Sequence, residues 1–132
     1  MAKESILSQD WFRKGEIDLR AAETLLNAQN LEAGSFHIQQ AIEKYLKGYL
    51  VGKGWHLKRT HDLIDLLNEV IFYESGLESF RDLCMKATEF YIEDRYPFAV
   101  NSELNENELR TILKKAKDLI QKVVSLNREE KE

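Results

Sequence analysis

Three short polar stretches contain the side chains that could bind a ligand or take part in a reaction. The first is "QQAIEKYLK", residues 39–47, the second is "RTHD", residues 59–62, and the third is "EDRYP", residues 93–97. Lysine, arginine and histidine side chains donate hydrogen bonds to anions, and aromatic rings offer flat surfaces for stacking. The chemistry that these residue types suggest is therefore the binding of a phosphate-bearing ligand.

The first stretch lies on an expected helix and has two interpretations. At about 100° per residue, Gln40, Lys44 and Lys47 fall opposite an apolar stripe that includes Ile42. Glu43 and Lys47 form an i, i+4 pair, which contributes about 0.3–0.5 kcal/mol on an exposed helix. These residues indicate either an ordinary solvated face or a surface on which Lys44 and Lys47 hold phosphate.

The second stretch stands at the start of an expected helix. Thr60 is a good N-cap, and Asp62 in the first turn suits the positive end of the helix dipole. Capping alone explains these two residues. A helix N-terminus also attracts anions, and Arg59 and His61 could add donors there, with His61 gaining charge at lower pH.

The third stretch combines an arginine with an aromatic residue. If the preceding helix reaches Arg95, this side chain falls on the rim of an apolar stripe, where its guanidinium could enter a crevice and hold an anion bidentately. Tyr96 beside it could line the pocket or stack on a ligand. The alternative is a rim arginine that pairs with Asp94 or Glu93.

Other common kinds of site are missing from the sequence. His37, His56 and His61 have neither the i, i+4 spacing of a zinc helix nor the Glu-x-x-His pattern of a carboxylate bundle. There is no P-loop, no G-x-G-x-x-G and no G-x-S-x-G motif, and the setting of Cys84 predicts a small buried hydrophobe. We therefore expect no metal, no cofactor and no catalytic residues of these types.

Helices alone are expected to position the polar stretches. Apolar residues recur at spacings of three and four, and no segment reads convincingly as a strand. Gly52 should stop the second helix, and Pro97 should break the fourth close to Arg95. Asn105 and Glu108 resemble a capping box. The expected helices span residues 9–29, 33–51, 61–72 and 77–94, with a fifth that starts near residue 105.

Together these elements predict an all-α fold. Four long amphipathic helices joined by short connections would form a four-helix up-and-down antiparallel bundle, with the third as one additional short helix packed at an end. A chain of 132 residues has the size of one domain. We expect a single helical domain over residues 1–132, with its core over residues 9–126 and a frayed tail over residues 127–132.

Composition and charge narrow the possible partners. The net charge of −4 argues against tight binding to duplex DNA, because a basic surface supplies most of that affinity. The single cysteine cannot form an internal disulfide, and the chain has neither a signal-peptide segment nor an apolar run of the length that spans a membrane. We therefore expect a cytoplasmic protein that binds neither membranes nor duplex DNA.

The order of the motifs resembles a known family. Trp11, "DLRAAETLL", "QQAIEKYLKGYLVGKG", "RTHDL" and "DRYP" follow one another as in the HEPN domain, and the resemblance runs from about Trp11 to Val123. It implies an all-α bundle, usually a homodimer, often encoded beside a minimal nucleotidyltransferase. In such pairs the HEPN protein is a partner or substrate-binding subunit, or the toxin half of a toxin–antitoxin pair.

Many HEPN proteins are ribonucleases, whose motif is an arginine followed four to six residues later by a histidine. This chain lacks the motif, because every histidine precedes Arg81 and Arg95, and Arg59 is too close to His61. Loss of a proton-transfer group typically costs about 10²–10⁴-fold in rate. The resemblance thus favours a non-enzymatic module that binds a nucleotide or an RNA end. The alternative is a metal-independent ribonuclease toxin with another proton donor, such as His61 or Tyr96, and a third interpretation is a pure scaffold that holds a partner chain.

In the favoured interpretation the cations contact phosphate, His61 donates a hydrogen bond and Tyr96 stacks or lines the pocket. Part of the motif is structural, since Gln40 and Glu43 could tie helices together through buried hydrogen bonds. The expected ligand-binding residues are Lys44, Lys47, Arg59, His61, Asp62, Arg95 and Tyr96.

Overall fold

The computed structural model describes residues 2–54, 56, 59–91 and 104–131, and every regular element in this part of the chain is helical. In chain order the elements are α1 (Ala2–Asn27), α2 (Leu31–Gly52), α3 (Leu63–Tyr73), the 3₁₀-helix η1 (Ser75–Phe80), α4 (Arg81–Thr88) and α6 (Glu106–Lys131). No strand occurs among these described residues, and the predicted all-α fold is confirmed.

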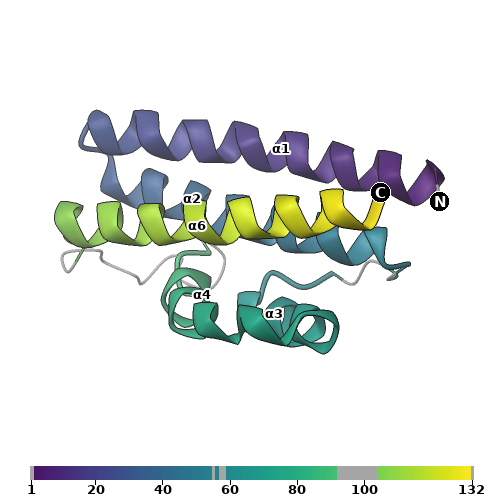
Figure 1. The fold of residues 1–132 in the computed structure, drawn as a ribbon. Helices are drawn as coiled ribbons and strands as arrows, with labels where there is room; N and C mark the ends of the chain where they lie inside the picture. The colour runs from purple at the N-terminus through teal and green to yellow at the C-terminus, as the bar shows by residue number, and fades with distance from the viewer. Residues whose placement is uncertain (1, 55, 57–58, 92–103, 132) are drawn as a thin grey trace.

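The three long helices lie side by side and form the body of the molecule (Figure 1). Helices α2 and α6 run in the same direction, opposite to α1, while α3 and α4 lie on one side of this body (Figure 1). Helix α2 contacts α1, α3, α4 and α6. It is therefore the central helix of the fold.

Close packing of α1 on α2 depends on residues without bulky side chains. A Cβ atom added at Gly48 would lie 2.6 Å from Cε1 of Phe12, and one added at Gly15 would lie 2.6 Å from Cε2 of Tyr45. The rings of Phe12 and Tyr45 stack with their centroids 5.3 Å apart. The two glycines therefore let the aromatic rings of one helix rest on the backbone of the other.

Helix α1 begins at Ala2, several residues before the predicted start. Ser8 in this added part is fully buried, and its hydroxyl donates to the carbonyl of Gly48 at 2.8 Å. The second helix also begins slightly earlier than predicted, at Leu31, because the Asn30 side chain caps it by accepting from the N–H of Ala33.

Helix α3 begins at Leu63 and its N-cap is Asp62, so the prediction that Thr60 caps this helix is wrong. Asp62 Oδ1 accepts from the N–H of Ile64 at 2.8 Å. The Thr60 hydroxyl instead accepts from the N–H of Asp62 at 3.2 Å, in the turn before the helix. A carboxylate satisfies the same exposed N–H groups as a hydroxyl and also suits the helix dipole.

The predicted fourth helix over residues 77–94 is wrong in its bounds. Its first part is the 3₁₀-helix η1, and α4 ends at Thr88. Tertiary contacts lie at this end: the Thr88 hydroxyl accepts from the N–H of Leu63 at 2.9 Å, and Tyr91 stacks on His61. These contacts hold the end of α4 and the residues after it against the segment that precedes α3.

Helix α6 starts as the sequence predicts. Asn105 Oδ1 accepts from the N–H of Glu108 at 3.1 Å, which confirms one of the two hydrogen bonds of the predicted capping box. Its buried apolar residues repeat at spacings of three and four and pack into the core; they are Leu109, Ile112, Leu113, Ala116, Leu119, Ile120 and Val123.

Cys84 is fully buried in this core, as predicted, and burial raises the pKa of its thiol to about 12. Among the described residues, none of the helices has the length and apolar character needed to cross a membrane.

Candidate functional site

A polar arc runs along the central helix. At about 100° per residue, five side chains of α2 fall within roughly 120° of one another. Asp18 of α1 borders this arc on one side, and the segment of residues 59–62 borders it on the other. The residues of the polar arc are His37, Gln40, Glu43, Lys44 and Lys47.

Glu43 is the centre of the first cluster on the polar arc. Its side chain is only 5% exposed, and it accepts from Gln39 Nε2 at 3.0 Å and from Lys47 Nζ at 2.9 Å. His61 Nδ1 lies 3.0 Å from Glu43 Oε1. Because a carboxylate only accepts, the proton of this contact belongs to Nδ1, and Nε2 remains on the outer edge of the ring.

Further hydrogen bonds fix the segment that carries His61. Gln39 Nε2 also donates to the carbonyl of His61 at 2.9 Å, and Gln40 Nε2 donates to Gln39 Oε1 at 2.7 Å. The ammonium of Lys47 lies 5.8 Å from the centre of the Trp11 ring, which favours its charge further. Both the main chain and the ring of His61 are therefore held by the central helix.

Asp18 is the centre of a second cluster with the same composition. It forms an ion pair with Lys44, and its Oδ1 lies 2.8 Å from His37 Nδ1. Each buried carboxylate thus has one lysine and one histidine. The side chains of His37 and His61 are 31% and 42% exposed, so both rings are held from inside and still reach solvent.

A row of aromatic rings connects the two clusters. His61 and Tyr91 stack with centroids 4.0 Å apart and planes 14° apart. Phe36 lies 6.1 Å from Tyr91 and 5.3 Å from His37, measured between ring centroids. Rings of this kind supply flat, partly exposed surface next to hydrogen-bond donors.

The solvated-face interpretation of the first stretch is wrong for Glu43 and Lys47. The predicted i, i+4 pair is present, but it is buried, because helices cover α2 on the polar side as well as on the apolar side. The expectation that Gln40 and Glu43 form buried hydrogen bonds agrees with the structure for Glu43. Lys44 is partly exposed and is the lysine of the arc that reaches solvent most readily.

The second stretch divides between two roles. Arg59 and His61 are exposed, and His61 belongs to the polar network. The carboxylate of Asp62 caps α3. Arg95 and Tyr96 of the third stretch lie outside the described residues, and their expected roles stay predictions.

Several residues of the site were missed at the level of sequence: Asp18, His37, Gln39 and Tyr91. Asp18 carried a usable signal, since it follows Gly15 by three residues and precedes Ala22 by four, on the buried face of α1. A charged residue at such spacing indicates a buried ion pair. Tyr91 continues the apolar stripe of the predicted fourth helix, and the early end of α4 could not be foreseen.

The arrangement suits anion binding and proton transfer more than metal binding. Each imidazole has Nδ1 held by a carboxylate, so its Nε2 can accept a hydrogen bond when the ring is neutral and donate one when the ring is charged. Within the described part of the chain, no group of three or more His, Cys, Asp or Glu side chains could hold a metal ion.

The fold and site define an all-α bundle built around one central helix that carries the polar arc. The family model described as "HEPN domain" matches residues 8–130. Among solved structures, the crystal structure of TT1696 from Thermus thermophilus is similar, with 26% identity, a TM-score of 0.66, and coverage of 92% of this chain and 96% of that chain. Comparison with curated proteins found no match. The chain belongs to the HEPN domain family.

Proposed function

We propose that this chain is a helical binding module that holds a nucleotide or the end of an RNA at the exposed edge of the polar arc. In this proposal His61, Arg59 and Lys44 contact phosphate, and the aromatic row beside Tyr91 packs against a base. The module acts as a cytoplasmic homodimer and as the substrate-binding partner of a separately encoded minimal nucleotidyltransferase, in a toxin–antitoxin-like pair. The resemblance to such HEPN partners supports this part of the proposal.

One observation carries the binding role: the His61 ring is tied to buried Glu43 and is still 42% exposed. A side chain that is ordered before the ligand arrives loses less conformational entropy on binding. The Nε2 atom at the outer edge of the ring is then preorganised, and it donates to phosphate when both ring nitrogens carry a proton. Arg59, exposed two residues earlier, adds positive charge on the same segment.

We assign Lys47 a supporting role rather than a contact with phosphate. Its ammonium already compensates the charge of Glu43, and leaving such a buried carboxylate unpaired costs about 3–5 kcal/mol. Lys44 differs, because it is partly exposed and has three donor positions to divide between Asp18 and a ligand. Asp62 supports the site by capping α3.

Calorimetric titration with ATP, GTP and short single-stranded RNAs tests this proposal, without and with the partner nucleotidyltransferase. We expect at least one ligand to bind, and His61→Ala to weaken its binding about tenfold, equivalent to about 1.4 kcal/mol. His56→Ala is the matched control, since His56 is exposed and belongs to neither cluster. Absence of heat at millimolar ligand under both conditions contradicts the proposal.

A second candidate function is a metal-independent ribonuclease with a non-standard proton donor. The observation that favours it is the pair of histidines, His37 and His61, each with Nδ1 against a buried carboxylate. Cleavage of RNA by its own 2′-hydroxyl needs one group to take a proton and another to give one, and two such rings would supply both.

Incubation of the purified protein with tRNA and mRNA separates the two functions. The ribonuclease predicts cleavage that is lost in His61→Ala and retained in His56→Ala. The binding module predicts intact RNA with the wild-type protein and with both variants. Binding that depends on His61 without any cleavage therefore favours the first proposal.

A further inference from the structure

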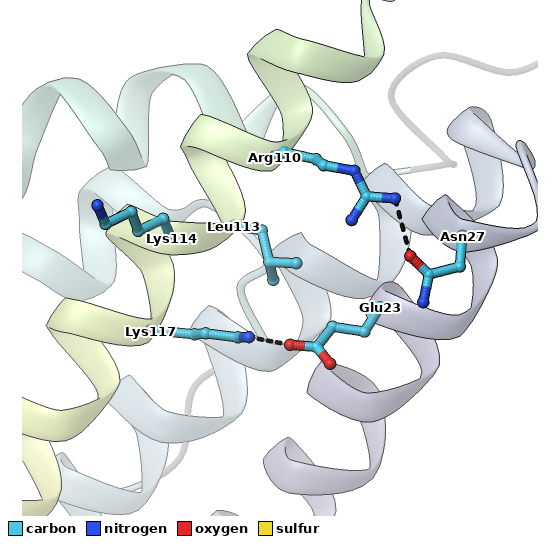
Figure 2. Close-up of a pocket in the computed structure, with 6 residues that line it drawn as sticks. All are labelled: Glu23, Asn27, Arg110, Leu113, Lys114 and Lys117. Atoms are coloured by element: carbon cyan, nitrogen blue, oxygen red, sulfur yellow. Dashed lines mark hydrogen bonds and ion pairs between the residues drawn. The ribbon is translucent and has the colours of Figure 1, made fainter.

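A cationic cleft of about 360 Å³ lies between α1 and α6, away from the polar arc (Figure 2). On α1, Glu23 of the cleft and Asp18 of the second cluster point about 140° apart, so the two sites use different sides of this helix. The residues that line the cleft are Glu23, Asn27, Arg110, Leu113, Lys114 and Lys117.

The spacing along α6 concentrates positive charge at the cleft. Arg110, Lys114 and Lys117 stand at i, i+4 and i+7, which places them within about 60° of one another around the helix. Among the described residues that line the cleft, three are therefore cations and one, Glu23, is a carboxylate, while Glu106 next to the cleft pairs with Arg110. This local excess stands out in a chain whose net charge is −4.

The present partners of these cations are replaceable. Arg110 Nη2 donates to the neutral amide oxygen of Asn27 at 2.8 Å, and Lys117 pairs with Glu23 (Figure 2). Arg110 Nε also pairs with Glu106 of its own helix at 3.0 Å, a partly exposed i, i+4 pair that leaves the Nη atoms for a ligand. Both side chains of the Lys117–Glu23 pair are well exposed, and such pairs contribute little stability. Lys114 extends away from α1 and has no ion-pair partner within the part of the chain that the structure describes (Figure 2).

We propose that this cleft binds a ligand with at least two linked phosphate groups. Arg110 and Lys117 are about 10 Å apart along the helix axis, which is more than one phosphate group spans. A phosphate oxygen forms a charge-assisted, forked bond with a guanidinium and so replaces the neutral oxygen of Asn27. The released amide of Asn27 then donates its own N–H to the ligand. The site is separate from the polar arc and does not depend on the function proposed for it.

Two probes distinguish a free polyphosphate ligand from a nucleic-acid backbone. They are tripolyphosphate and a short unstructured single-stranded RNA. We expect Lys114→Gln to weaken binding of the probe about fivefold to tenfold and to lower the slope of log K against log salt concentration by about one. Lys115→Gln is the matched control, because Lys115 is exposed on α6, loses the same charge and does not line the cleft. Binding of only one probe supports the site and assigns its ligand to that source.

Glu23→Gln gives the sharper test, because it removes the one carboxylate among the described lining residues and frees Lys117. We expect tighter binding by severalfold, a gain that a merely structural ion pair does not produce. Tripolyphosphate binding should also persist in His61→Ala, which distinguishes the cleft from the polar arc. Equal losses in Lys114→Gln and Lys115→Gln, weaker binding in Glu23→Gln, or no binding of either probe at low salt would overturn the proposal.

Discussion

Glu43 on the central helix and His61 in the segment before α3 are in direct contact, with 3.0 Å between Glu43 Oε1 and His61 Nδ1. Glu43 is buried, whereas His61 reaches solvent. The contact therefore fixes a partly exposed imidazole ring to a buried residue of the bundle core. The proposed binding function depends on this relationship.

Removing the Glu43 carboxylate should destabilise the fold strongly. Glu43→Ala leaves the buried ammonium of Lys47 without its ion-pair partner, and we expect the free energy of unfolding to fall by about 3–5 kcal/mol. Urea denaturation followed by circular dichroism measures the change. Asp10→Ala is the control, since the Asp10–Arg13 pair is exposed and its loss should cost at most about 0.5 kcal/mol. Similar values for the two variants would show that Glu43 has no structural role.

Adding one methyl group between α1 and α2 should also be costly. In Gly48→Ala the new Cβ would lie 2.6 Å from Phe12 Cε1, and overpacking of this kind costs about 1–3 kcal/mol. Alanine's better helix propensity offsets about 1 kcal/mol of this loss. We therefore expect a net destabilisation of up to about 2 kcal/mol in thermal or urea unfolding.

Gly76→Ala provides the comparison for this experiment. A Cβ added at Gly76 would meet no heavy atom within 4 Å outside the adjacent backbone, so the stability of Gly76→Ala should stay within about 0.5 kcal/mol of the wild type. A Gly48→Ala protein that is stabilised by about 1 kcal/mol, the gain from helix propensity alone, would contradict the close approach of the two helices.

The fold was predictable from the sequence where local signals and tertiary packing agree. The spacing of apolar residues and the Asn105 cap specify α6 without knowledge of its neighbours. The bounds of the fourth helix were not predictable in this way. Its end coincides with a hydrogen bond from the main chain of Leu63 to the Thr88 hydroxyl, a contact between segments that no local pattern reveals.

The candidate site was predictable only in part, for a related reason. Helical periodicity gives the side of α2 on which Lys47 lies. It does not reveal whether another helix packs against that side. Lys47 is buried because α2 is central, and this follows from topology rather than from its own sequence. The motifs that contain Glu43 and His61 are recognisable in the sequence. Their contact is not, because it depends on how the chain between them folds back onto α2.

Alkaline pH should destabilise the protein through Tyr45. Burial, and secondarily the nearby Glu16 carboxylate, raise the pKa of Tyr45 to about 12, against about 10 in the unfolded chain. Above pH 10 the unfolded state releases this proton and the folded state keeps it, so stability falls as pH rises. The expected loss reaches about 2 kcal/mol by pH 12.

Urea denaturation at pH 9 and pH 11.5 measures this effect, with Tyr45→Phe as the control that cannot ionise. The fall in stability should be smaller in Tyr45→Phe, although not zero, because burial also raises the pKa of Tyr49. An equal fall in the wild type and the variant would exclude Tyr45 as a source of the pH dependence.

The central claim is that buried Glu43 holds His61 at Nδ1 so that the outer edge of the ring meets a phosphate-bearing ligand. Proton–nitrogen NMR of the histidine rings, recorded during titration with a nucleotide or RNA, tests this most directly. We predict that free His61 carries its proton on Nδ1 when neutral, and that ligand shifts its Nε2 signal while the signals of exposed His56 stay in place. A neutral His61 ring with its proton on Nε2 would contradict the account. So would a His61 ring whose signals do not move when the ligand binds.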